Sequence, residues 1–390
     1  MDITPASRHR TAAREDGHTG RPDAPVPDQP PDQLEEAPLL EAARAGEEQA
    51  FRRLVEPHRG RLTAHCYRML GSLFDAEDAV QDTLVKAWRG LAGFDGRSRV
   101  GTWLFRIATT TCLNALRSRS RRELPLNRGF RTDDPRHAVG TPLDESVWLE
   151  PFPDAVLGGR AGTDPEASYE LRESVELALV AAWQHLPAKQ RAALLLTEVL
   201  GFPARDVADL LDTTTPSVTS ALQRARAVVA ERVPEQSQQA TMRTVGDAAV
   251  SAAVDRFLQA MERADVDAVV GQLREDATWS MPPQPAWFAG PEAIAAFLVA
   301  NPFRWFRWRY LRTRSNGQPA LAAYSWDEAA RRFLPHSIDV LSFRRDRIAA
   351  VTSFLDVTRR GVTGPGFRSF TRSRLFDRFA LPEALPARGR

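Results

Sequence analysis

Asp75-Ala-Glu-Asp-Ala-Val-Gln-Asp-Thr-Leu-Val-Lys-Ala-Trp88, with the basic stretch that follows it, decides the fold of the N-terminal part of this chain. An apolar stripe at partial helical spacing and acidic residues on the other side predict an amphipathic helix. After a polar break, a second helix is predicted from Thr102 onward. Seven arginines and no acid occur between Gly96 and Arg122. An acidic helix beside a basic one indicates two partners, a basic protein surface and a nucleic acid.

Aromatic residues accompany the arginines of the second helix. Arginine releases phosphate counterions and so supplies affinity for DNA. Trp103 and Phe105 can in addition stack on, or wedge between, unpaired bases. The combination favours a surface for single-stranded or melting DNA. A solvated basic face beside core aromatic residues is the alternative for this block taken alone.

A second helical block spans residues 171–232 and has the pattern of a helix-turn-helix. One helix runs from Ala188 to Leu200 and ends at Gly201, as helices often do at glycine. A last helix starts at Pro216, with Thr215 as its capping residue. Apolar residues fall where the final two helices should pack together, namely at Val207, Ala208, Leu211, Val218 and Leu222.

The outer face of the last helix carries small hydroxyl and amide side chains followed by arginines. Such side chains can reach base edges, while arginines grip phosphate or guanine. The outward residues are Ser217, Thr219, Ser220, Gln223, Arg224 and Arg226. An ordinary helical hairpin that never touches DNA is the alternative.

The order of these two blocks resembles the extracytoplasmic-function (ECF) group of sigma-70 type transcription initiation factors. The resemblance covers residues 39–122 and 171–233, and it implies two all-α domains, one for the −10 and one for the −35 promoter element. It implies contacts to core RNA polymerase from Asp78, Gln81, Asp82, Lys86 and Trp88. It implies −10 contacts from Phe94, Arg97, Ser98, Arg99, Trp103, Arg106, Asn114, Arg117 and Arg119. It implies −35 contacts from Thr214, Thr215, Ser217, Thr219, Ser220, Gln223, Arg224 and Arg226.

The segments around these domains differ from them in composition. Residues 1–38 are rich in proline and charge and predict a disordered tail. Residues 123–170 lack periodicity and predict an interdomain linker. The linker contains Trp148-Leu-Glu-Pro-Phe-Pro-Asp154, whose aromatic residues need a surface to bury on. This run resembles the regulatory linker motif, here Trp148, Phe152 and Asp154, of ECF groups that carry a C-terminal extension; anchoring on the polymerase is an equal alternative.

Residues 245–356 have the pattern of an α+β domain. Helices are predicted over 248–264, 266–273 and 292–299, and a strand over 277–281. Strands are also predicted over 305–315, 320–326, 333–343 and 348–355, with Asn316-Gly317 as a hairpin turn. The element order is similar to the SnoaL-like, ketosteroid-isomerase-type cone. Residues 357–390 form a basic tail.

This domain could enclose a pocket or a catalytic site. Candidates to line a pocket, most of them expected to be core, are Trp279, Met281, Trp287, Phe297, Tyr324, Trp326 and Phe354. Candidate acids and bases are Asp276, His336, Asp339 and Asp356. His336 and Asp339 are three positions apart and should face opposite sides of a strand. We therefore expect a regulatory or ligand-sensing domain rather than an enzyme.

Composition limits the remaining function classes. Cys66 and Cys112 are isolated, so no disulfide framework or metal motif is expected, and no cofactor. No signal peptide or membrane span is evident, and a cytoplasmic location is expected. The sequence thus predicts a multidomain sigma factor whose partners are core RNA polymerase and promoter DNA, with an unknown small ligand or an anti-sigma protein as a further candidate. The alternative is a helix-turn-helix regulator fused to a ligand-binding or enzymatic SnoaL-like domain.

Overall fold

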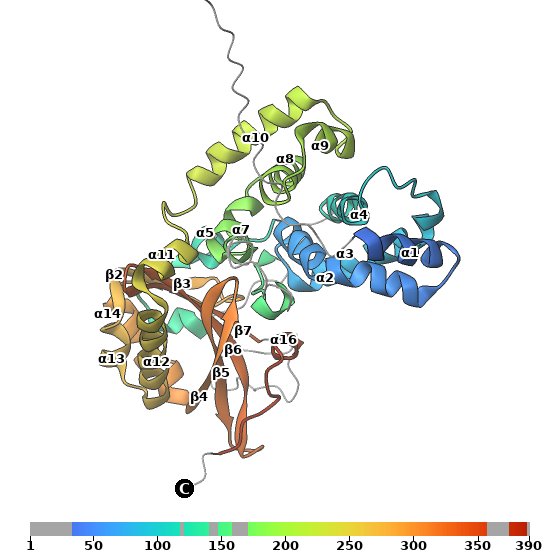
Figure 1. Cartoon of the computed structure of the whole chain (residues 1–390). Coiled ribbons are helices and arrows are strands. Elements are labelled where there is room, and N and C mark those ends of the chain that lie inside the picture. The colour runs from blue at the N-terminus through green and yellow to red at the C-terminus, as the bar shows by residue number, and fades with distance from the viewer. Residues whose placement is uncertain (1–32, 118–120, 140–146, 158–170, 357–373, 388–390) are drawn as a thin grey trace, which may run out of the picture.

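The computed structural model describes residues 33–117, 121–139, 147–157, 171–356 and 374–387. Two groups of helices lie on one side of the molecule and a seven-stranded sheet with its own helices lies on the other (Figure 1). Residues 1–32 of the predicted N-terminal tail, Arg119 and most of the basic C-terminal tail lie outside the described residues. Residues 33–38 are not disordered, contrary to the prediction, but begin a helix that runs from Gln33 to Arg44.

The first helical group forms around a helical hairpin. Gly71 adopts a left-handed conformation between the two central helices, and the Ser72 hydroxyl caps the second of them by accepting from the Asp75 amide. Such a cap satisfies an amide that the helix itself cannot pair. The elements are α1 (Gln33–Arg44), α2 (Glu48–Leu70), α3 (Leu73–Gly90), η1 (Leu91–Gly93) and α4 (Val100–Ala115).

The second helical group is the predicted helix-turn-helix. Gly201 has a φ of +69° and ends the first half, as expected. The final helix starts one residue earlier than predicted, because Thr214 and not Thr215 provides the cap through its hydroxyl. The five predicted packing residues are all buried. The elements are α7 (Leu177–Gln184), α8 (Ala188–Leu194), η5 (Leu195–Val199), α9 (Ala204–Leu210) and α10 (Thr215–Ala230).

The linker is more ordered than its composition suggested. It contains α5 (Pro125–Arg128), β1 (Phe130–Arg131), η2 (Pro135–Val139) and η4 (Asp154–Leu157). β1 pairs in parallel with β3 (Ala286–Ala289), so two linker residues form the edge of the C-terminal sheet. A strand this short carries no alternation that sequence analysis could detect.

The C-terminal domain has the predicted α+β architecture. Its sheet has the order β1-β3-β2-β7-β6-β5-β4, and Asn316-Gly317 forms the predicted hairpin turn. The other strands are β2 (Leu273–Ser280), β4 (Trp308–Ser315), β5 (Gln318–Asp327), β6 (Arg332–Arg344) and β7 (Arg347–Leu355). The helices are α11 (Gln238–Val245), α12 (Asp247–Arg263), α13 (Val266–Val270), α14 (Pro291–Ala300), α15 (Pro302–Trp305) and α16 (Arg374–Arg378). β3, α11, α15 and α16 were not predicted.

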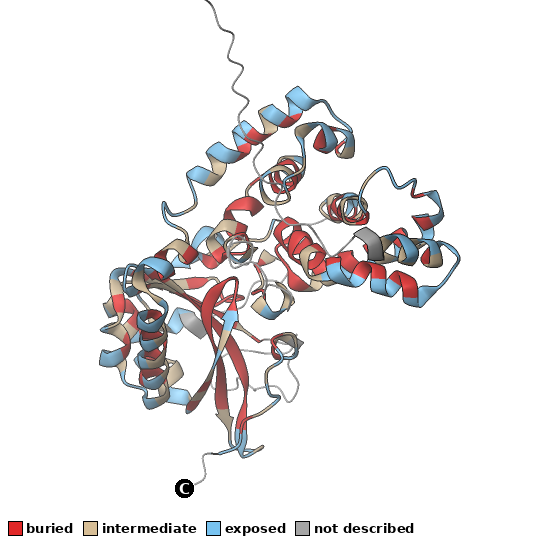
Figure 2. Cartoon of the chain, viewed as in Figure 1, coloured by how far each residue is buried: buried red, intermediate tan, exposed pale blue. Residues whose placement is uncertain are grey.

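Three apolar cores hold the chain together (Figure 2). The first is continuous through both helical groups and includes Leu149 and Phe152 of the linker. The second lies between the sheet and its helices and contains Trp279, Met281 and Phe297. The third lies on the opposite face of the sheet. It contains Tyr324 and Phe354, so these two residues do not line the interior of the cone as the sequence suggested.

The strand β6 carries a bulge that overturns one sequence inference. Ser337 pairs with Ala323 and Pro335 with Tyr324, which leaves His336 as the extra residue. The His336 ring lies 4.7 Å from Trp308, and burial together with nearby Asp339 raises the pKa of Tyr310. Trp308 and Tyr310 share one face of β4. His336 and Asp339 therefore face the same side of the sheet, because the bulge resets the alternation.

The buried His65 of α2 predicts an acid-sensitive N-terminal domain. Its Nε2 lies 2.9 Å from the Thr109 hydroxyl, and burial, with the nearby Arg68 charge, lowers its pKa to about 3. The unfolded chain takes up a proton below pH about 6.5, whereas the folded domain does not. Stability should therefore be full above that pH and fall by about 1.4 kcal/mol per pH unit from this residue as the pH drops toward 3. Hydrogen exchange of α2 amides at pH 7 and 5 would measure this slope, which His65→Gln should reduce; an equal slope in both proteins would contradict the assignment.

Candidate nucleic-acid interface

The outer face of α3 presents the residues expected to contact a polymerase. Asp78, Gln81, Asp82 and Lys86 are exposed. Trp88 is half-buried and packs edge-on against Phe51, with ring centroids 5.1 Å apart. The Lys86 ammonium donates to the Thr111 hydroxyl of α4 at 2.9 Å. The face is thus acidic and accessible, whereas Trp88 serves mainly to fix α3 on α2.

The break between α3 and α4 is built on a pair of aromatic rings in tilted contact. Phe94 and Trp103 have centroids 4.8 Å apart, and the Arg44 guanidinium donates to the Phe94 carbonyl. Phe94 is only 6% exposed, so it supports the loop and does not present its ring as a base-trapping group. Trp103 is partly exposed and is the aromatic residue that this surface offers to a base.

The basic side chains of α4 are accessible, but its second aromatic residue is not. Phe105 is 4% exposed and packs against His65 and Phe202, so the sequence interpretation of Phe105 as a base-stacking residue is wrong for this conformation. Of the residues predicted to contact the −10 element, the exposed ones are Arg97, Arg99, Arg106, Asn114 and, just beyond α4, Arg117, and Ser98 is half-buried.

The recognition helix α10 exposes the residues predicted to read DNA. Thr214, Thr215, Ser217, Thr219, Gln223, Arg224 and Arg226 are exposed, and Ser220 is half-buried. Arg224 donates to the Ser220 hydroxyl at 2.6 Å, and Arg226 pairs with Glu198 at 2.5 Å. Both arginines are at the surface, where such pairs are weak and can be exchanged for phosphate.

The two helical groups pack directly on each other through buried arginines. Arg68 of α2 donates from Nε to the Ser174 carbonyl at 3.1 Å. Arg191 of α8 donates to the Met69 carbonyl and, at 2.6 Å, to the Gln184 side chain. Burial lowers the pKa of Arg68 to about 9 and that of Arg191 to about 10, so both remain charged near neutral pH. Each guanidinium loses its contacts with water on burial and gains hydrogen-bond acceptors of the protein instead. The contact between the two helical groups is therefore directional as well as apolar.

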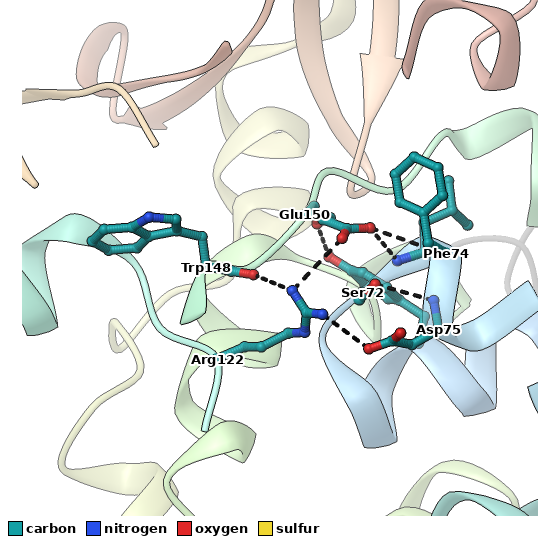
Figure 3. Close-up of polar contacts among 8 residues, drawn as sticks. Ser72, Phe74, Asp75, Arg122, Trp148 and Glu150 are labelled. Carbon is teal, nitrogen blue, oxygen red and sulfur yellow. Dashed lines mark hydrogen bonds and ion pairs between the residues drawn. The ribbon is translucent and has the colours of Figure 1, made fainter. Parts of the chain in front are cut away.

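The linker motif binds the start of α3 (Figure 3). The Glu150 carboxylate accepts from the Leu73 and Phe74 amides at 2.9 and 3.2 Å, which places negative charge at the helix N-terminus. Arg122 donates to Asp75 at 2.9 Å and to the Trp148 carbonyl at 2.9 Å. Glu150 and Arg122 thus attach the linker to the helix that carries the acidic face.

Asn316, at the tip of the β4–β5 hairpin, joins the C-terminal domain to the linker and to both helical groups. Its Nδ2 donates to the Tyr67 hydroxyl of α2 and to the Val175 carbonyl, both at 2.8 Å. Its Oδ1 accepts from the Phe152 amide at 2.9 Å. The Tyr67 hydroxyl in turn donates to the Glu150 carbonyl at 2.8 Å. One fully buried side chain therefore connects the C-terminal domain to both helical groups and to the linker.

The neighbours of Asn316 extend this junction. The Asp154 carboxylate accepts from the Gly317 amide at 2.8 Å and pairs with Arg314 at 3.0 Å. A Cβ on Gly317 would lie 2.6 Å from the Arg172 carbonyl oxygen, so the close approach requires glycine. The sequence left two alternatives for the linker motif, contact with the C-terminal extension or anchoring on the polymerase. The contacts described here are those of the first alternative.

Comparison with known proteins agrees with this architecture. Three families match the chain: sigma-70 region 2 over residues 54–122, sigma-70 region 4 over residues 176–228, and the SnoaL-like domain over residues 254–351. The chain is 40% identical over 333 residues to the ECF RNA polymerase sigma factor SigG of Mycobacterium tuberculosis, covering 85% of this chain and 84% of that protein. The chain belongs to the ECF sigma factors.

One further relative matches about half of the chain, and one solved structure matches most of it. The ECF RNA polymerase sigma-E factor of Haemophilus influenzae is 28% identical over 203 residues, which cover 52% of this sigma factor and 97% of that one. The crystal structure of the Mycobacterium tuberculosis ECF sigma factor SigJ aligns with a TM-score of 0.51 at 21% identity, covering 77% of this chain and 94% of that one. This likeness supports the fold. In the part of the sigma factor that the structure describes, no helix is long and apolar enough to cross a bilayer.

The C-terminal helix α16 adds a contact that sequence analysis of this sigma factor missed. Arg378 pairs with Glu77 of α3, with its Nε 3.0 Å from the carboxylate, and its guanidinium lies 3.8 Å from the centre of the Phe74 ring. Phe376 anchors the segment by packing on Tyr324 with ring centroids 5.1 Å apart. Arg378 and the buried Phe376 and Phe379 lie in the C-terminal tail. Composition alone describes this tail only as basic.

Proposed function

We propose that this ECF sigma factor binds core RNA polymerase through the acidic face of α3, reads the −35 element with α10 and opens the −10 element with α4 and the preceding loop. One observation carries the proposal: a chain of this family exposes three separate surfaces, one acidic and two basic. It acts by binding and positioning, without chemistry of its own. The alternative, a regulator that recruits no polymerase, has no use for the exposed face of α3.

We propose further that the closed arrangement of the two sigma domains restrains this activity. The −35 and −10 elements lie roughly 25 base pairs apart, or about 85 Å along the duplex. A compact body of 200 residues is only about 40 Å across. Because the two domains share one core and the buried Arg68 and Arg191 contacts, they must separate before both elements are bound.

The SnoaL-like domain is the part that stabilises the closed arrangement. Asn316 and Asp154 connect it to the linker, and Asn316 also bonds to Tyr67 of the first domain and Val175 of the second. Glu176 accepts from the Gln238 and Gln239 amides at 2.9 and 2.7 Å, which adds a bond between the second domain and α11. A ligand or protein that weakens these bonds would shift the population toward the open form.

Run-off transcription with purified core polymerase tests the sigma activity. Templates from a genomic library would be transcribed with the full chain and with Asp82→Arg, which reverses one charge on the exposed face of α3. Start sites that appear with the full chain and are lost with Asp82→Arg would support the proposal. Absence of transcripts, together with absence of core co-purification, would contradict it and favour the regulator class.

The contact of Arg378 with α3 leads to a prediction on polymerase affinity. Glu77 lies four residues before Gln81 and therefore on the same side of α3, so α16 covers one edge of the proposed docking face. Arg378→Glu places two carboxylates together and removes the guanidinium from Phe74. Because the pair is partly exposed, we expect a gain of about threefold to tenfold in affinity for core polymerase, measured by biolayer interferometry.

Arg345→Glu is the matched control for this experiment. Arg345 is an exposed residue of the β6–β7 turn, so the change in net charge is identical without a contact to α3. Equal affinities for the native chain and Arg378→Glu, with hydrogen exchange showing that α16 has been released, would mean that α16 does not cover the docking face.

A further inference from the structure

A groove of about 700 Å³ lies at the end of the SnoaL-like sheet where β4 begins and β5 ends. Its position is remote from promoter recognition, because β4 and α10 are at opposite ends of the molecule (Figure 1). The C-terminal segment forms one wall, where Leu385 pairs with Phe333 through two backbone bonds of 2.9 Å. The lining residues that matter here are Glu262, Arg263, Arg307, Trp326, Glu328 and Arg331.

The floor of the groove is aromatic. Phe333 is buried and Trp326 is half-buried, and both lie on the face of the sheet that carries the third core, whereas Trp308 lies on the other face of the sheet. Trp326 packs edge-on against Phe333 with ring centroids 5.1 Å apart. The Arg307 guanidinium lies over the Trp326 ring, 4.4 Å from its centre. An indole face and a guanidinium plane are both surfaces on which a flat heterocycle stacks.

The rim of the groove is positively charged. Four arginines and two glutamates line it, and Arg309 and Phe333 add a further contact between guanidinium and ring. Within the described residues, Arg263 and Arg331 have no ion-pair partner. Arg309 Nε and Trp326 Nε1 are buried donors that no described acceptor satisfies. Guanidinium groups that line a groove lower the free energy of a bound anion.

The two glutamates restrict the kind of anion. Glu262 accepts from the Tyr310 amide at 3.0 Å, and Glu328 lies 3.8 Å from Arg307 at the surface. A simple polyanion would be repelled by these carboxylates. A ligand that carries hydroxyl donors beside its anionic groups would use them as acceptors.

We propose that this groove binds a nucleoside di- or triphosphate. The base stacks on the Trp326–Arg307 platform, the arginines at the rim hold the phosphates, and a glutamate accepts from the ribose hydroxyls. The volume lies within the range of about 300–1,000 Å³ that is usual for small-molecule sites. The inference is independent of the sigma activity, since the groove contains no residue of the polymerase or promoter surfaces.

Isothermal titration calorimetry of the full chain at physiological salt tests the site. ATP, GTP and their diphosphates would be titrated as ligands, with adenosine and tripolyphosphate as probes of each half. We expect a micromolar Kd for at least one nucleotide. Both probes should bind at least tenfold more weakly, which corresponds to about 1.4 kcal/mol of binding free energy. Arg331→Glu should weaken nucleotide binding at least tenfold, whereas Arg345→Glu, an equal charge change on another exposed turn, should not.

Trp326→Leu tests the stacking platform separately. Trp326→Leu should weaken nucleotide binding at least tenfold and leave tripolyphosphate binding unchanged. If Trp326→Leu does not fold, Arg331→Glu still tests the site, because Arg331 lies at an exposed turn. The proposal is overturned if no nucleotide binds below about 1 mM. It is equally overturned if tripolyphosphate binds as tightly as the nucleotides, or if Arg331→Glu has the same nucleotide affinity as the native chain.

Discussion

Asn316→Gly should open the molecule and raise transcription from a cognate promoter at least tenfold. The substitution removes the side chain that bonds to Tyr67, Phe152 and Val175, while glycine keeps the backbone φ of +56° without strain. Three buried polar groups outside the hairpin then lose a partner, and each costs about 1–3 kcal/mol in the closed state. A loss of at least 3 kcal/mol corresponds to a shift of more than about a hundredfold in the closed-to-open ratio.

The measurement combines initial rates of run-off transcription with the radius of gyration from small-angle scattering. Arg345→Gly is the matched control, because it removes an exposed side chain at another turn residue with a φ of +56° in the same domain. Tyr67→Phe should give a smaller effect in the same direction, since it removes only the hydroxyl that Asn316 contacts. A folded Asn316→Gly protein with unchanged dimensions and unchanged transcription would show that Asn316 does not restrain the sigma domains.

The sequence predicted most elements of each domain, but not how the domains associate. Helix ends at Gly201 and the turn at Asn316-Gly317 follow from local backbone preferences, so they were predictable. The side chain of Asn316 is different: its partners are up to 249 positions away in the chain, and no local pattern encodes such a contact. β1 and α16 were missed for a related reason, because each is too short to show a period and is stabilised by the sheet it meets.

The exposure of the candidate site residues was predicted where helical spacing alone decides it, and was missed where packing decides it. The polar residues of α3 and α10 are at the surface, as helical spacing predicts. Phe94 and Phe105 are buried because α1 and the second sigma domain cover them, and those contacts depend on tertiary structure. His336 and Asp339 turned out to share a face because of a bulge, a feature that residue alternation cannot reveal.

Trp103→Ala should reduce formation of the open promoter complex by about tenfold to a hundredfold while changing core-polymerase affinity much less. Trp103 is the partly exposed ring of the Phe94–Trp103 pair, and stacking of one base on an aromatic side chain contributes about 1–3 kcal/mol. Permanganate reactivity of unpaired thymines would measure opening, and biolayer interferometry would measure core affinity. Trp103→Phe keeps a ring and should have an intermediate effect.

A template with a preformed bubble separates a melting role of Trp103 from a structural one. If the indole stabilises unpaired bases during opening, the Trp103→Ala defect should shrink on that template, because the cost of unpairing has already been met. If Trp103 only supports the loop through Phe94, the variant should lose thermal stability and core affinity, and its transcription defect should be equal on both templates. Opening at the native rate on duplex DNA would exclude the melting role altogether.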